Sequence, residues 1–183
     1  MNIPTDLKYA KTDEWIRVKG SEAEAGLTDY AQGHLSDIVY VELPEVGAEF
    51  KSAASFGSIE SVKAASDLNM PAGGTITAVN ESLSDAPEVV NSDPYGKGWI
   101  YKIKPSNWIA DVKSCYFAEE ATNWSSAELE RFKDFLAISM KNYSPEPSML
   151  ILQDGGEICD HSLSALPNEI WRDFEAEFLN LNR

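Results

Sequence analysis

The sequence has few cysteines and few histidines. Cys115 and Cys159 are the two cysteines among 183 residues, and only two histidines accompany them. No pair of these residues has the spacing of a zinc site or of a disulfide framework. We therefore expect two reduced thiols in the protein interior, rather than a disulfide or redox pair, and no metal site.

Positive charge is also scarce. The chain has 15 Lys and Arg against 30 Asp and Glu, which gives a formal net charge of −15. Phosphate backbones and anionic membrane surfaces repel a chain this acidic. The charge therefore argues against nucleic acid and membrane as partners, and it favours docking on basic protein surfaces.

Long hydrophobic runs are missing as well. No stretch approaches the roughly eighteen apolar residues of a membrane span. The first residues, "MNIPTDLKYAKTDEW", lack both the layout of a secretion signal and the Arg-rich bias of a transit peptide. The sequence predicts a bacterial cytoplasmic protein; a mitochondrial matrix location would require that a presequence had been removed.

Motifs of catalysis are absent too. The sequence contains no G-x-S-x-G elbow, no P-loop and no G-x-G-x-x-G that opens a helix after a strand. His34 and His161 lie in different parts of the chain, and neither has an obvious nucleophile beside it. These absences argue against acyl transfer or hydrolysis by the chain itself.

Residues 8–107 are typical of a mainly β fold. Short alternating or β-branched runs separated by turn residues predict strands in "EWIRVKG", "SEAEAGLT", "DIVYVELP", "SFGSIESV", "TITAVNESL" and "WIYKIKP". Thr28 and Asp29 predict the cap of a short helix over "YAQGHL". The spacing favours a small β sandwich or flattened barrel.

The composition changes after Asn107, so we expect one domain over residues 1–107 and a small α+β unit over 108–183. Ser125 to Glu128 has a capping-box pattern and opens a helical period. The apolar strand "SMLILQ", the turn "DGG" with "EIC", and the helix "PNEIWRDFEAEFLNL" follow. A unit of this size has a marginal core of its own, so we expect it to pack on the β domain or on a partner.

A single lysine marks the stretch "FGSIESVKAASDLNMPAGG", residues 56–74. Lys63 lies in a turn between small residues, where a modifying enzyme could reach its amine, and acylation would remove its charge. Taken alone, the stretch is more typical of an ordinary solvated surface lysine.

Four longer segments distinguish these alternatives. "LKYAKTDEWIRV", "GLTDYAQGHLSDIVYVELPEVG", the lysine stretch and "VNESL…PEVVNSDPYGKGWIYKIKPS" stand in this order with plausible spacing. Together they closely resemble the H protein of the glycine cleavage system over about residues 7–107. In biotin carriers, which share this type of fold, the attachment lysine resembles one flanked by methionines. Here Val62 and Ala64 flank Lys63.

The resemblance implies a lipoyl/biotinyl-type hybrid sandwich (barrel-sandwich hybrid), with two antiparallel sheets and the modified lysine on a hairpin turn. Lipoate would be joined to Lys63 by an amide. The carrier would take an aminomethyl group from glycine at a pyridoxal-phosphate glycine decarboxylase and pass it to an aminomethyltransferase. A dihydrolipoyl dehydrogenase would reoxidise the arm, and a lipoate ligase or a lipoyl/octanoyl transferase would attach it.

The resemblance also implies a cleft that shelters the loaded arm. Glu14, His34 and Asp67 match its residues, and two carboxylates with an imidazole suit a cationic aminomethyl group. Asp13 departs from the histidine that often precedes the Glu-Trp pair in the family.

The extension leaves alternatives open. The chain could instead be an H-like lipoyl donor in lipoate relay, or a regulatory adaptor with residues 108–183 as a docking module. Cys159, Asp160 and His161 are adjacent in sequence, and because adjacent residues on a strand or turn point in different directions, a metal or catalytic cluster is disfavoured. The stripe of Trp171, Phe174 and Phe178 is more typical of a core than of a docking face.

Overall fold

The computed structural model describes residues 2–143 and 167–179. The chain divides into two compact units, Met1–Thr122 and Asn123–Arg183. Residues 108–122, which the sequence analysis placed in the extension, thus fall within the first unit. There β10 (Tyr116–Phe117) pairs with β1 (Lys8–Tyr9), and the backbone N–H of Gly73 donates to Asp111 Oδ2 at 2.9 Å.

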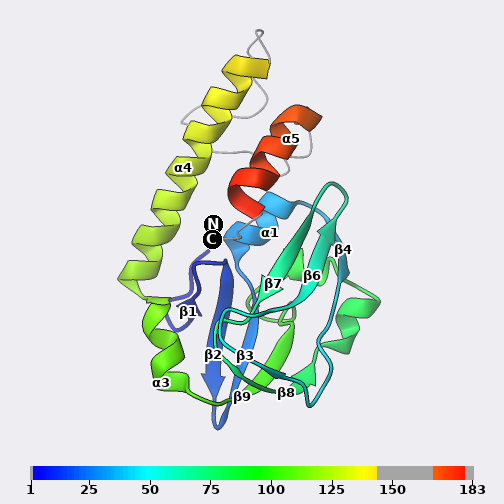
Figure 1. The fold of residues 1–183 in the computed structure, drawn as a ribbon, viewed down its shortest axis with the longest axis vertical. Helices are drawn as coiled ribbons and strands as arrows, with labels where there is room; N and C mark the ends of the chain where they lie inside the picture. The colour runs from blue at the N-terminus through cyan, green and yellow to red at the C-terminus, as the bar shows by residue number, and fades with distance from the viewer. Residues whose placement is uncertain (1, 144–166, 180–183) are drawn as a thin grey trace. The chain divides into compact units, whose positions relative to one another are not determined.

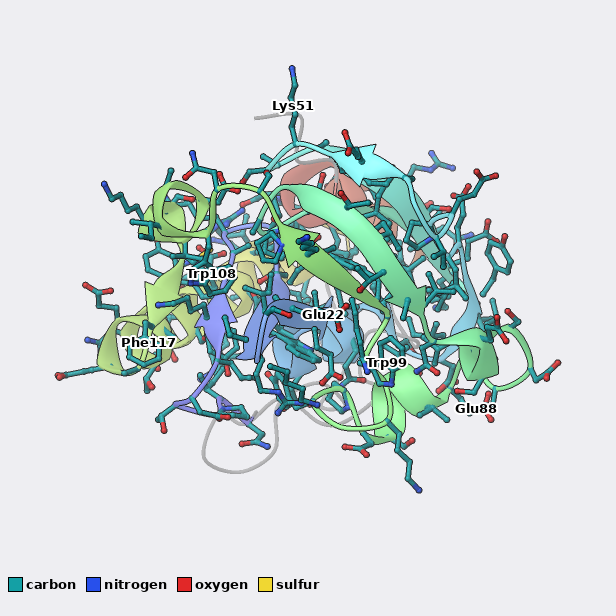
Figure 2. The ribbon with its side chains drawn as sticks, turned by 90° about the horizontal axis from the view of Figure 1, so that it is seen from below. Glu22, Lys51, Glu88, Trp99, Trp108 and Phe117 are labelled. Carbon is teal, nitrogen blue, oxygen red and sulfur yellow. The ribbon has the colours of Figure 1, made fainter. Side chains whose placement is uncertain are left out.

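The first unit contains a seven-stranded antiparallel sheet in the order β10-β1-β2-β3-β9-β8-β5. Its remaining strands are β2 (Glu14–Lys19), β3 (Glu22–Leu27), β5 (Glu49–Phe50), β8 (Gly74–Val79) and β9 (Tyr101–Pro105). The predicted strand "EWIRVKG" corresponds to β2, which pairs with β3 along its whole length from Glu14 opposite Leu27 to Lys19 opposite Glu22. The outer strand β10 ends at Phe117, labelled in Figure 2, where Lys8 Nζ lies 4.4 Å from the ring centroid.

A second, three-stranded antiparallel sheet has the order β4-β6-β7. Its strands are β4 (Ile38–Val41), β6 (Ser55–Ser61) and β7 (Ala65–Asn69). β6 and β7 form a hairpin, which Figure 1 shows as two strands that run side by side to the turn that joins them. Two antiparallel sheets confirm the mainly β prediction.

Short helices connect the strands. The predicted cap is confirmed: Thr28 precedes α1 (Asp29–Leu35), and its hydroxyl accepts the backbone N–H of Ala31 at 3.1 Å. The 3₁₀ turns η1 (Glu81–Ser84) and η2 (Val112–Ser114) and the single-turn helices α2 (Val89–Ser92) and α3 (Trp108–Asp111) complete the unit.

Aromatic side chains connect the two sheets in the core. Phe56 of β6 packs edge-on against Tyr101 of β9, with ring centroids 4.8 Å apart. Trp15 is fully buried, and its Nε1 donates to the carbonyl of Pro94 at 3.0 Å. A Cβ at Gly26 would lie 3.0 Å from the Trp15 ring, so a larger residue there would displace the indole.

A buried carboxylate joins the strands of the larger sheet. Glu24 is 3% exposed, and its carboxylate lies 2.8 Å from Arg17 Nη2, 2.8 Å from Lys19 Nζ and 3.7 Å from Lys102 Nζ. Burial tends to raise the pKa of Glu24, but the hydrogen bonds and charges of Lys19 and Arg17 outweigh it and leave the pKa lowered. Lys102 Nζ also lies 4.6 Å from the ring centroid of Trp99, labelled in Figure 2.

The second unit is built on α4 (Glu119–Tyr143), which starts within the first unit, α5 (Asn168–Phe174) and a π-helical turn (Glu175–Leu179). The predicted start of the first helix is wrong: Ser125 lies inside α4 and is buried, because the helix begins at Glu119. The predicted strands "SMLILQ" and "EIC" lie outside the described residues, as do Cys159, Asp160 and His161.

The aromatic stripe forms the core of this unit, as predicted. Trp171, Phe174 and Phe178 are 4%, 0% and 8% exposed. Phe174 and Phe178 pack on Phe132 and Phe135 of α4 with ring centroids 5.4 to 6.2 Å apart. Among the described residues, no helix is both long and apolar enough to cross a membrane.

Candidate modification site

The turn between β6 and β7 presents Lys63 at the surface. Glu60 pairs with Ala65, and the backbone N–H of Ser61 donates to the carbonyl of Ala64 at 2.8 Å. Val62 and Lys63 are therefore the two residues at the tip. Both are exposed, Val62 by 69%, whereas Ser61 and Ala64 on either side are buried.

The hydroxyl of Ser61 shapes this turn. It accepts the backbone N–H groups of Lys63 at 3.3 Å and Ala64 at 3.0 Å, and it donates to the carbonyl of Ala64 at 3.2 Å. Serine often stabilises turns in this way, because its side chain satisfies backbone groups that the turn leaves without a ladder partner. The backbone N–H of Val62 also donates to the carbonyl of Asp37 at 3.2 Å, which ties the tip to the start of β4.

We predict that Ser61→Ala destabilises the turn. The amide of Ala64 would lose its acceptor, and the free energy of unfolding should fall by about 1 kcal/mol. Hydrogen exchange at the Ala64 amide should become faster than in the parent chain. Ser66→Ala, in the adjacent strand β7, is the matched control; equal exchange at Ala64 in both variants would contradict the role given to Ser61.

Glu14 lies at the start of β2, and its carboxyl group is buried. The residue is 2% exposed; Oε1 accepts the backbone N–H of Asn69 at 2.8 Å, and Oε2 accepts the hydroxyl of Thr12 at 2.5 Å. Burial raises the pKa of Glu14 to about 7 despite these hydrogen bonds, which favour the charged form. Near neutral pH the protonated form of the group is therefore populated.

His34 lies in the last turn of α1 and is buried. Its Nδ1 is 2.6 Å from the carbonyl of Tyr30, and the two rings are 4.1 Å apart between centroids. A carbonyl only accepts, so Nδ1 bears the proton and Nε2 is an acceptor. Burial lowers the pKa of His34 to about 4, and the imidazole is neutral at pH 7.

Asp67 lies on β7 and is exposed, opposite Ser58 in the register. Asn69, which donates to Glu14, is two residues further along the same strand, so Asp67 and Asn69 share a face of the sheet. The structure thus connects Glu14 with the strand that bears Asp67. His34 contacts Tyr30, one turn earlier in the same helix.

Sequence reasoning missed the groups that hold Glu14. Thr12 is two residues away, but Asn69 is 55 residues away, and no local pattern predicts that pair. Tyr101 is a second omission: burial and the nearby charge of Glu14 raise the pKa of its phenol well above its usual value. Ser61 could have been found, since a serine just before a predicted turn is a common turn residue.

Cys115 falls in the first unit. Its thiol is free and half-buried, and Sγ lies 3.9 Å from the carbonyl of Pro71. Burial raises the pKa of the Cys115 thiol, which keeps it protonated at neutral pH. Cys115 is half-buried, so it lies at the edge of the core and not in the interior where the sequence placed it. No group of three or more metal-ligating side chains that could hold a metal ion occurs in the part of the chain that the structure describes.

Comparison with known families identifies the first unit. The family model described as glycine cleavage H-protein matches residues 7–127. The chain belongs to this family. The match extends about twenty residues beyond the predicted limit at 107 and ends within α4.

Individual H proteins agree with this assignment. The glycine cleavage system H protein of Acinetobacter baumannii (strain ATCC 17978) is 55% identical over 113 residues, which cover 62% of this chain and 90% of its own. That of Geobacillus kaustophilus is 49% identical over 120 residues, covering 66% and 94%. A crystal structure of the H protein from Mycobacterium marinum is 40% identical, with a TM-score of 0.54, and covers 57% of this chain and 87% of its own. The predicted lipoyl-type sandwich is confirmed.

Proposed function

We propose that this member of the H-protein family carries lipoate in amide linkage to Lys63 and shuttles the aminomethyl group derived from glycine. The carrier role in glycine cleavage follows from the family. The observation that supports the attachment point is the exposed position of Lys63 at the tip of a two-stranded hairpin.

The residues around Lys63 would fix the base of the arm. The Ser61 hydroxyl accepts hydrogen bonds from amides of the turn itself. The hydrogen bond from the Val62 N–H to the Asp37 carbonyl connects the turn to the start of β4. When bound, lipoate would supply the reactive sulfurs, so no cysteine of this chain is required at the site. We infer that the chain itself is a non-catalytic component whose task is to position the arm.

Glu14, His34 and Asp67 are proposed to receive the loaded arm. Asp67 is the exposed residue among these three, so its carboxylate would contact a cationic group first. Each oxygen of Glu14 already accepts one hydrogen bond, from Thr12 or from Asn69, and the carboxylate would receive the cation through its remaining lone pairs. The neutral His34 would offer Nε2 as an acceptor, so it would not repel the cation.

The proposed partners follow from the same function. They are a pyridoxal-phosphate glycine decarboxylase, an aminomethyltransferase, a dihydrolipoyl dehydrogenase, and a lipoate ligase or a lipoyl/octanoyl transferase. The two relatives named above are bacterial proteins, and we propose that this chain acts in the cytoplasm.

Reconstitution of the first reaction tests the proposal. The full chain, with and without lipoate, is mixed with the pyridoxal-phosphate decarboxylase, and exchange between bicarbonate and the carboxyl group of glycine is measured. We expect exchange only with the lipoylated chain. A lipoylated chain that supports no exchange would reject the shuttle and leave the lipoyl-relay and adaptor alternatives as the remaining predictions.

A further inference from the structure

A bulge in β4 exposes two neighbouring apolar side chains. Ile38 pairs with Ser61 and Tyr40 with Glu60, so Val39 is an extra residue in β4. In a regular strand, successive side chains alternate between faces. Here both Val39 and Tyr40 are exposed, by 51% and 50%, between the buried Ile38 and Val41.

These side chains border the turn that bears Lys63. Ile38 pairs with Ser61, and the backbone N–H of Val62 donates to the carbonyl of Asp37 at 3.2 Å. A strand rises about 3.3 Å per residue, so Tyr40 lies on the order of 10 Å along the chain from this hydrogen bond. We name Val39, Tyr40 and Val62, all at least half exposed, the tip patch.

Acidic residues surround the tip patch. Asp37 precedes β4, Glu42 follows it, and Glu60 lies opposite Tyr40 in the register; all three are exposed. The Ser58 hydroxyl donates to Glu42 Oε2 at 3.0 Å, which orients that carboxylate. The patch is therefore apolar at its centre and negative at its edge. A complementary surface has an apolar centre flanked by Lys or Arg.

We propose that the tip patch is the docking surface for the enzyme that acylates Lys63, a conclusion that rests on the proposed function. That enzyme must bring an activated acyl donor to Nζ, and the unmodified side chain offers only a four-carbon stem. Its surface must therefore cover the residues beside the tip. Enzymes that act on the lipoylated lysine receive a longer arm and can bind further away.

The reaction at the docked surface is an acyl transfer. The deprotonated Nζ attacks the carbonyl carbon of an activated lipoyl donor, such as the acyl-adenylate that a ligase forms from lipoate and ATP. The C–N bond forms, the bond from that carbon to the adenylate oxygen breaks, and the nitrogen loses a proton. The bulge is consistent with a recognition role, because bulges often re-aim side chains next to functional sites.

Lipoylation kinetics test the assignment. The full apo chain is incubated with a lipoate ligase, ATP and lipoate, and intact mass gives the rate of modification at several chain concentrations. We expect the double variant V39S/Y40S to lower kcat/KM at least tenfold, mainly through KM. Val46→Ser and Ile109→Ser, at positions 62% and 74% exposed, are matched controls and should change it less than twofold.

Charge reversal provides a second measurement that does not alter the apolar centre. Glu60→Lys with Glu42→Lys should also lower kcat/KM, and added salt should reduce the difference from the parent chain. If V39S/Y40S is lipoylated at Lys63 with the kcat/KM of the parent chain, the tip patch is not the docking surface for the acylating enzyme. If that variant is lipoylated normally but loses glycine–bicarbonate exchange, the tip patch is instead a docking surface for the decarboxylase. A parent chain that takes up no lipoate would reject the proposed function as well.

Discussion

Lys63→Arg is expected to abolish lipoylation. The guanidinium group keeps the charge and much of the length of lysine, so the turn and its exposure should be preserved. It remains protonated at any working pH, however, and cannot attack an acyl carbonyl. Intact mass after incubation with a lipoate ligase, ATP and lipoate should show complete conversion of the parent chain and none of the variant.

A second lysine provides the matched control for this experiment. Lys51 is exposed and is labelled in Figure 2, and Lys51→Arg should leave lipoylation unchanged. Glycine–bicarbonate exchange with Lys63→Arg should fall to the level of the unmodified parent chain. Addition of one lipoyl group to Lys63→Arg would show that another residue is the attachment point.

Glu14→Gln is expected to stabilise the protein above neutral pH. Burial raises the pKa of Glu14 from 4.5 to about 7 in the folded protein. Between these values the folded chain holds a proton that the unfolded chain has lost, so the contribution of Glu14 to stability falls as the pH rises. Glutamine occupies the same space, has no charge to desolvate, and can still accept the N–H of Asn69. At pH 8 the gain in the free energy of unfolding should reach at most roughly 3 kcal/mol.

Denaturant unfolding at pH 4 and pH 8 measures this effect. The difference between Glu14→Gln and the parent chain should be small at pH 4, where both the folded and the unfolded parent are largely protonated at this residue. Glu22→Gln, at the half-exposed start of β3, is the matched control, and the effect of Glu14 is measured as the difference between the two variants. A difference of equal size at pH 4 and pH 8 would show that Glu14 does not titrate as described.

The same variant tests the proposed cleft. Glutamine cannot neutralise a cationic aminomethyl group, so the loaded arm of Glu14→Gln should release its cargo several-fold faster than that of the parent chain. Lipoylation itself should be unchanged. An unchanged rate of release would remove Glu14 from the cleft.

The parts of the fold that the sequence predicts are those that local chemistry determines. The strand over residues 14–19 and the Thr28 cap were predicted from local patterns, and both are confirmed, although burial along the strand does not alternate. β7, with the sequence "ASDLN", has no β-branched residue, and no residue pattern predicted a strand there. It is a strand because it pairs with β6, which is a tertiary effect.

The candidate site also has features that the sequence predicts and features that it does not. The turn at Lys63 and its exposure could be predicted, because small residues and a serine surround the lysine. The burial of Glu14 and its bond to Asn69 could not, because they depend on which strands come together. The Ser125 capping box was misleading for the same reason: the helix extends from Glu119, so the pattern falls in its interior.

The contact between Phe56 and Tyr101 has a consequence for motion. Phe56 is at the base of the hairpin and Tyr101 is in the opposite sheet, so the strand that leads to Lys63 is packed into the core. Fraying of this hairpin would therefore require the core to open as well, and such openings are rare in a folded domain. If Lys63 bears the proposed lipoyl group, its attachment point would stay fixed while the group moves through solvent, and encounters with each enzyme would depend on diffusion of the arm and not on local unfolding of the hairpin.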